Sequence, residues 1–187
     1  MALEIERRFL VRGEEWRELI AWQAHLQQGY LVSGPEGLTL RVRTATSTAT
    51  AKAEAGQQAW LTLKTAASDG GLVRQEFEYD IPLADAQDLL AIAPSQLSKR
   101  RHGLSLAGGD WVLDVFEGSN APLVVAEVEL EHAEQSLLVP SWCHLELTGH
   151  SSLSNAALAH SPLADWPELQ RQALLAGLAD WPTAGQV

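Results

Sequence analysis

The chain has 187 residues, of which 46% are hydrophobic and 20% charged, a composition typical of a single folded domain. Its net charge of −11 argues against nucleic acid or an anionic membrane as partner, because both are bound through clustered Lys and Arg. The single cysteine, Cys143, excludes an internal disulfide and a cysteine-based zinc cluster. No apolar run approaches the ~18 residues of a membrane span. The single cysteine fits a reducing compartment, so we expect a cytoplasmic protein.

The first predicted element is a strand over residues 3–11. Strand side chains alternate between two faces, so Glu4, Glu6 and Arg8 share one face and apolar side chains occupy the other. A strand with one apolar face normally turns its charged face to water. Taken alone, this strand therefore predicts only the edge of a half-buried sheet.

The same alternation returns in later segments, at residues 40–43, 60–64, 74–79, 97–101, 111–116 and 126–131. One sheet face would then collect Glu4, Glu6, Arg8, Arg41, Arg43, Lys64, Arg74, Glu76, Glu78, Lys99, Arg101, Asp114, Glu127 and Glu129. An open sheet would expose that face to water, whereas a sheet curled with its charges inward would form a polar tunnel. The alternation by itself does not choose between these arrangements.

Helical patterns lie between and after these strands. Residues 13–27 carry apolar side chains at helical spacing, and residues 83–92 form a predicted helix between Pro82 and Pro94. Residues 44–58, rich in Ala and Thr, are expected to form a long hairpin loop. The tail from residue 161 contains a further predicted helix over residues 168–178, which would pack on the outside of the sheet.

The residues themselves favour the tunnel. Glu4-Ile5-Glu6-Arg7-Arg8 resembles the Glu-x-Glu-x-Lys signature of the triphosphate tunnel metalloenzymes, also called the CYTH superfamily. The resemblance runs from about residue 3 to about residue 160 and is closest to small bacterial inorganic tripolyphosphatases. It continues in order through Gln28-Gly29-Tyr30-Leu31, the Arg41/Arg43 pair, Leu61-Thr62-Leu63-Lys64, residues 70–78, Lys99-x-Arg101, residues 113–118 and Glu127-Val128-Glu129-Leu130.

The resemblance implies an α+β fold, an eight-stranded antiparallel β-barrel or tunnel with helices packed on the outside. Residues 1–160 would form the CYTH triphosphate tunnel domain, and residues 161–187 a helical extension packed on or beside it. Seven of the 13 Lys and Arg residues and seven of the 24 Asp and Glu residues fall on the predicted inner face. The remainder of the chain then carries the whole net charge of −11. Such an acidic exterior repels an extended polyanion, so a short, metal-complexed polyanion bound inside the tunnel is the more plausible ligand.

The implied activity is metal-dependent hydrolysis of inorganic tripolyphosphate to pyrophosphate and orthophosphate. Arginine binds phosphate oxygens with a planar fork and lysine as a compact charge. Carboxylates on such a face supply hard oxygen ligands for Mg²⁺ or Mn²⁺, and we expect two ions, one bridging phosphate oxygens and one activating water. The predicted substrate-binding residues are Arg41, Arg43, Lys64, Arg74 and Arg101, with Arg8 and Lys99 as catalytic candidates. The metal candidates are Glu4, Glu6, Glu127 and Glu129, then Glu76 and Asp114, whereas Glu78 and Glu131 are interpreted as salt-bridge residues.

Two departures from the family pattern leave alternatives open. Arg8 stands where the signature has lysine, and arginine cannot release its proton to act as a base. Ser151-Ser152-Leu153-Ser154, just before Asn155-Ala156-Ala157-Leu158-Ala159, lacks the tyrosine and positive charges of relatives. The alternatives are therefore an adenylyl cyclase, a thiamine or nucleoside triphosphatase, and a non-catalytic triphosphate-binding module. A homodimer formed through the tail is also left open.

Overall fold

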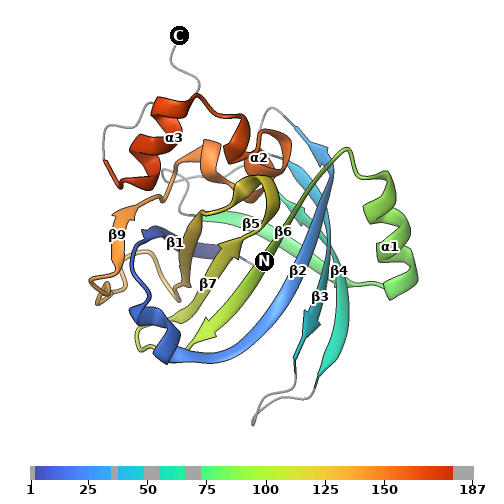
Figure 1. Cartoon of the computed structure of the whole chain (residues 1–187). Coiled ribbons are helices and arrows are strands. Elements are labelled where there is room, and N and C mark those ends of the chain that lie inside the picture. The colour runs from blue at the N-terminus through green and yellow to red at the C-terminus, as the bar shows by residue number, and fades with distance from the viewer. Residues whose placement is uncertain (1–2, 35–37, 49–54, 66–72, 179–187) are drawn as a thin grey trace.

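The fold is an antiparallel sheet that curls into a ring, with helices on one side and across one end (Figure 1). This computed structural model describes residues 3–34, 38–48, 55–65 and 73–178, with only the backbone described at 3–4 and 73–74. The strands in this part of the chain are β1 (Leu3–Val11), β2 (Ile20–Ser33), β3 (Thr39–Ser47), β4 (Gly56–Lys64), β5 (Val73–Asp80), β6 (Ser95–Leu104), β7 (Asp110–Phe116), β8 (Val124–Glu129) and β9 (Cys143–Glu146).

The strand order is β5-β4-β3-β2-β6-β7-β8-β1-β9, and an additional pairing of β1 with β5 closes the ring. On that side of β1, residues Leu3–Ile5 pair with Val73–Gln75, and the later residues Phe9–Val11 pair with β9. Eight strands therefore form the closed ring, as predicted, and β9 is a short ninth strand beside β1. The predicted antiparallel tunnel with external helices is confirmed.

Burial distinguishes the curled sheet from the open one. Arg8, Arg41, Lys64 and Lys99 are all less than 10% exposed, although each belongs to the charged face of its strand. Asp114 and its neighbour Leu113 point to opposite faces of β7, yet both are fully buried. A charged face can be buried together with the apolar one only if it lies inside the ring and the apolar face is covered from outside.

Two layers cover the outer, apolar face. Helix α1 (Leu83–Ile92) packs its Ala86 against Val42 and Ala59 of β3 and β4. On the other side, the 3₁₀ helix η1 (Glu15–Leu19) inserts Trp16 into a cluster with Trp111 and Trp142. These contacts remove the outer apolar residues from water and so leave the sheet free to turn its charges inward.

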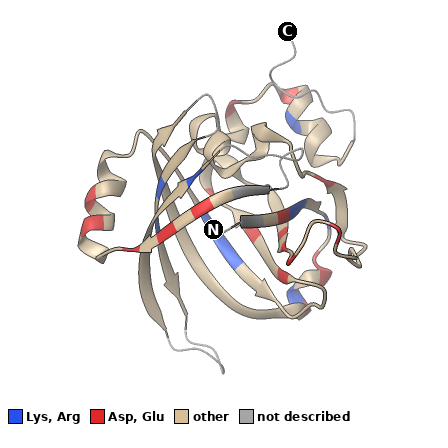
Figure 2. Ribbon diagram, turned by 180° about the vertical axis from the view of Figure 1, so that it is seen from behind, with Lys and Arg blue, Asp and Glu red and all other residues tan. Residues whose placement is uncertain are grey.

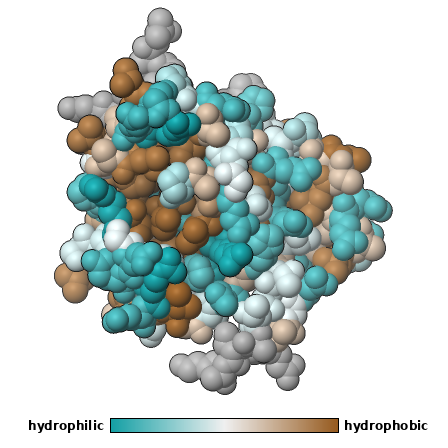
Figure 3. All heavy atoms as spheres, in the orientation of Figure 1, coloured by the Kyte–Doolittle hydropathy of each residue, from teal (hydrophilic) through white to brown (hydrophobic). Residues whose placement is uncertain are grey.

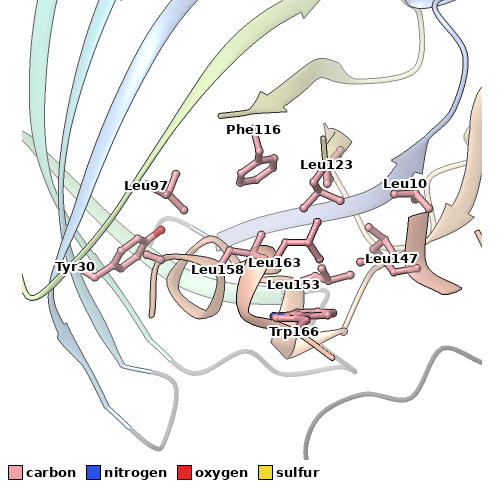
Figure 4. Packing of buried hydrophobic residues seen from close by; sticks show 13 residues of the cluster. Leu10, Tyr30, Leu97, Phe116, Leu123, Leu147, Leu153, Leu158, Leu163 and Trp166 are labelled. Carbon is pink, nitrogen blue, oxygen red and sulfur yellow. The ribbon is translucent and has the colours of Figure 1, made fainter. Parts of the chain in front are cut away.

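A third hydrophobic cluster closes one end of the ring (Figure 4). The strands contribute Tyr30, Leu97 and Phe116, and the C-terminal segment contributes Leu158 and Leu174 among others. Figure 3 shows apolar side chains gathered where α3 meets β1 and β9. The covering elements are η3 (Gly118–Asn120), η4 (Ser151–Leu153), α2 (Asn155–His160), η5 (Leu163–Asp165) and α3 (Glu168–Leu175).

The predicted helices had mixed outcomes. The helix over residues 83–92 is confirmed, and α3 matches the helix predicted for 168–178 except in its last turn. The helix predicted for residues 13–27 is wrong, because only η1 is helical and β2 begins at Ile20, paired with both β3 and β6. The helices seen in the described ranges are all too short or too polar to cross a bilayer.

Candidate active site

Charged residues from seven strands line the inside of the ring, and Figure 2 shows several of them as blue and red bands on neighbouring strands. One group, here called the Asp114 network, consists of Arg8, Lys99, Arg101, Asp114 and Glu127. Lys99 Nζ donates to Asp114 Oδ2 at 2.5 Å, and Arg101 grips the same carboxylate through Nε and Nη2 at 2.8 and 2.7 Å. One buried carboxylate thus holds two cations from β6.

Glu127 extends this network to β1 and to the covering segment. Its Oε2 accepts from Arg101 Nη2 at 2.6 Å, and its Oε1 accepts from Arg8 Nε at 3.1 Å. Arg8 Nη1 also donates to the carbonyl of Leu153 in η4, at 3.0 Å. Arg8 therefore joins the wall of the tunnel to the segment that closes its end.

The second group lies on β3, β4 and β5 and is here called the Glu78 network: Arg41, Arg43, Thr62, Lys64, Glu76 and Glu78. The Glu78 carboxylate accepts from Arg43 Nη2 at 3.0 and 3.1 Å, from Arg41 Nη2 at 3.3 Å and from Thr62 Oγ1 at 2.8 Å. Lys64 Nζ lies 2.8 Å from Glu76 Oε2. Cross-strand register explains the Thr62–Glu78 and Lys64–Glu76 contacts, because the two residues of each pair lie opposite each other on β4 and β5.

The environment shifts the pKa values of these groups. Burial, only partly offset by Asp114, lowers the pKa of Lys99 to about 8. Burial and repulsion from Arg41 lower the pKa of Arg43 to about 10. Burial alone would raise the pKa values of Asp114 and Glu127, but attraction to Arg101 and Lys99 outweighs it and lowers both. The carboxylates therefore stay ionised well below neutral pH.

A cavity of about 470 Å³ lies between the tunnel wall and the covering segment. The wall contributes Arg8, Arg41, Lys64 and Glu6, so three cations face this space. The covering segment contributes no Lys or Arg to the lining and instead presents Ser151, Ser154, Asn155, His150 and His160. The segment in which family-like positive charges are absent is therefore a wall of the cavity.

Several buried donors on the inner face have no acceptor among the residues that the structure describes. They are Arg8 Nη2, Arg41 Nε, Arg43 Nε and Gln28 Nε2. Buried polar atoms are almost always hydrogen-bonded, so a set of unpaired donors of one kind indicates a missing partner. All of them are N–H donors, so the missing partner would be an acceptor, and an anion with several oxygen atoms could accept from all of them.

The structure places the remaining predicted residues as follows. Glu4 and Arg74 are register partners on β1 and β5, and their side chains lie outside the described part of the structure. Glu76 and Asp114 are engaged by cations, whereas Glu129 is exposed. The roles assigned to the predicted site residues stay predictions.

Sequence reasoning gave no binding role to four residues that the structure brings into the site. Glu78, for which the sequence predicts a salt bridge, is indeed paired, and it lies at the centre of an inner-face network. Thr62 and Gln28 lie on the inner face by strict strand alternation, which would have identified them. Asn155 comes from the covering segment, and no strand pattern could have placed it.

Comparison with known proteins identifies the family. Residues 2–143, well over half of the chain, match the family described as CYTH domain. The chain belongs to this family. A protein of Nitrosomonas europaea named inorganic triphosphatase is 36% identical over 162 residues, covering 84% of this chain and 97% of that protein.

Two further relatives resemble this CYTH protein over most of its length. An inorganic triphosphatase of Acetivibrio thermocellus is 29% identical over 170 residues, which is 90% of this chain and all of that protein. A crystal structure of the inorganic triphosphatase NE1496 superimposes with a TM-score of 0.57 and 32% identity, covering 85% of this chain and 95% of that one.

Membership of this family implies dependence on a divalent metal, and the donors present fit one. Glu6 and Glu129 lie directly opposite each other on β1 and β8, and Glu127 lies two residues from Glu129 on the same face. Their carboxylates are hard oxygen donors, the ligand type that Mg²⁺ and Mn²⁺ prefer. No three Asp, Glu, His or Cys side chains converge as a complete metal site within the described ranges. Mg²⁺ commonly takes only one or two carboxylates and completes its shell with water and substrate phosphates.

Proposed function

We propose that this protein hydrolyses inorganic tripolyphosphate to pyrophosphate and orthophosphate inside the tunnel, with a divalent metal as cofactor. The observation that carries the proposal is the set of buried N–H donors without acceptors beside a cavity lined by Arg8, Arg41 and Lys64. The relatives named inorganic triphosphatase support the same assignment. Phosphoryl transfer needs mainly positioning and charge stabilisation, which such a donor set supplies.

The side chains would act chiefly by holding the phosphates. Arg8, Arg41 and Lys64 line the cavity and would bind phosphate oxygens there, with Arg43, Arg101 and Arg74 as further contacts along the tunnel. Because Arg8 and Arg41 each keep one side-chain nitrogen without an acceptor among the described residues, they can bind an anion without first breaking their ion pairs. The paired carboxylates keep these cations in place before the substrate arrives.

Glu6, Glu127 and Glu129 are the residues that would hold metal, and Glu4 is added by analogy with the signature. When bound, a divalent ion neutralises phosphate charge and makes a bound water more acidic. We further propose Mg²⁺ or Mn²⁺, two ions, and action in the cytoplasm. The carboxylates of Glu6, Glu127 and Glu129 lie on the neighbouring strands β1 and β8, and such hard oxygen donors support a cation at that position.

The test is release of orthophosphate from tripolyphosphate in the presence of Mg²⁺ or Mn²⁺, with ATP and thiamine triphosphate alongside. We expect release from tripolyphosphate, and at least a hundredfold slower release in Glu6→Gln with the fold retained. Faster turnover of an organic triphosphate would move the assignment to another branch of the family. Tight binding of tripolyphosphate without release would favour a binding module, an alternative supported by Arg8 and by the uncharged segment 151–154.

A further inference from the structure

Asn155 begins α2 at the point where the cavity meets the Asp114 network. Its Oδ1 atom accepts a hydrogen bond from Lys99 Nζ at 3.0 Å, and the same ammonium donates to Asp114 at 2.5 Å. Lys99 is fully buried and does not line the cavity, whereas Asn155 does. Asn155 is therefore the link between this buried cation and the space for substrate.

Lys99 determines which end of the Asn155 side chain is turned toward it. An ammonium group has only donors, so the atom that faces it must be the amide oxygen. The amide nitrogen then points away from Lys99, and its two N–H groups have no acceptor among the described residues. The backbone is held as well, because Ser154 Oγ accepts from Ala157 N at 3.1 Å in the first turn of α2.

We infer that Asn155 is a substrate-binding residue whose side-chain amide donates to a phosphate oxygen, and that Lys99 is the positioning residue that keeps this amide turned toward the substrate. The inference rests on the proposed function. Arg8, Arg41 and Lys64 line the same cavity, so a phosphate bound by them lies within the walls that Asn155 completes. A neutral donor adds a directional contact without adding charge. Lys99 then acts through Asn155, a different route from the direct catalytic contact predicted from its motif.

The first test measures binding and turnover in Asn155→Ala. We expect its Kd for tripolyphosphate, measured by calorimetry without metal and again with Mg²⁺, to be about tenfold weaker or more. KM should rise more than kcat falls, because a binding contact is lost. The control is Gln96→Ala, which removes an exposed amide that donates to the Leu90 carbonyl on the outside of the ring. An Asn155→Ala variant with the wild-type Kd and KM would overturn the inference.

The second test needs no variant, because the chain has only two asparagines, Asn120 and Asn155. The Asn120 side chain is bonded at both ends, its Nδ2 donating to the Leu158 carbonyl at 3.0 Å and its Oδ1 accepting from Leu163 N at 2.9 Å. In metal-free protein with ¹⁵N-labelled asparagine, tripolyphosphate should shift the Asn155 side-chain amide signals and leave those of Asn120 in place. An unmoved Asn155 signal at saturating tripolyphosphate would overturn the inference.

Lys99→Met tests the positioning role. We expect this variant to fold, because the buried Asp114 carboxylate keeps Arg101 as a partner. We expect a weaker Kd and a smaller response of the Asn155 amide to tripolyphosphate. A folded Lys99→Met protein with the wild-type amide response would overturn that role. Failure of the proposed function is visible separately in the wild-type protein. Absence of both binding and hydrolysis of tripolyphosphate overturns both proposals, whereas binding without hydrolysis overturns only the hydrolase assignment. Wild-type hydrolysis with an unaffected Asn155→Ala overturns only the inference.

Discussion

Arg101 and Asp114 lie directly opposite each other on β6 and β7, and the guanidinium holds the carboxylate through two hydrogen bonds of 2.8 and 2.7 Å. The same carboxylate accepts from Lys99, so one buried acid balances a fully buried lysine and a mostly buried arginine. Removing such charges from water is costly unless each has a partner. The carboxylates on the inner face therefore hold the phosphate-binding cations in place as well as serving as metal candidates.

Removal of the Asp114 charge should strongly destabilise the protein. Asp114→Asn leaves Lys99 and Arg101 as buried cations with reduced compensation, and we expect a loss of about 3–5 kcal/mol in the free energy of unfolding. Urea denaturation of both proteins measures this difference in the free energy of unfolding. The control is Asp110→Asn on the same strand, where the side chain is exposed and the change should be small. Equal losses in the two variants would show that burial of the ion pairs is not the cause.

Stability should fall in acid because of the same network. The pKa values of Asp114 and Glu127 are lower in the folded protein than in the unfolded chain, where carboxyl groups titrate near about 4. Their contribution is thus fully present above pH 4 and is lost as the pH falls through the lower folded values. Thermal unfolding from pH 7 to pH 3 should show the gap between wild type and Asp114→Asn narrowing below about pH 4. A gap independent of pH would contradict this assignment.

Replacement of Arg8 by the lysine of the family signature should loosen the covering segment. Arg8 bonds to both Glu127 and the Leu153 carbonyl, and a lysine ammonium is too compact to reproduce the geometry of both contacts. We expect Arg8→Lys to cost about 1 kcal/mol of stability in urea denaturation. Arg7→Lys is the control, because Arg7 makes its two bonds to Glu146 on the partly exposed side of β1. A larger loss in Arg7→Lys would refute the explanation.

Arg43 should matter for substrate affinity and Arg100 should not. Arg43 lies in the Glu78 network with Nε unbonded within the described structure, whereas Arg100 pairs with Glu117 on the outer surface. Arg43→Ala should raise KM for tripolyphosphate about tenfold or more, because a charged hydrogen bond is lost. Arg100→Ala should have nearly wild-type kinetics. The measurement is KM for tripolyphosphate from steady-state phosphate release. An equal rise of KM in both variants would argue against substrate binding on the inner face.

Much of the fold could be predicted from local patterns. Alternation of charged and apolar residues located the strands, and the prolines around residues 83–92 bounded α1. The helix predicted for residues 13–27 failed because residues 20–33 pair with two neighbouring strands at once. Those hydrogen bonds to distant segments outweigh a helical spacing of apolar residues, which is only a weak preference.

The sequence by itself determined which side chains share a strand face, because alternation depends only on backbone geometry. It therefore also determined the charged character of the inner face and, through its motifs, the family. Only the tertiary structure decided how those charges are paired, that Glu78 joins a network of arginines, and that Asn155 reaches Lys99 across 56 positions of the chain. Such contacts depend on how the ring closes and how the C-terminal segment packs over its end, and no local pattern encodes either.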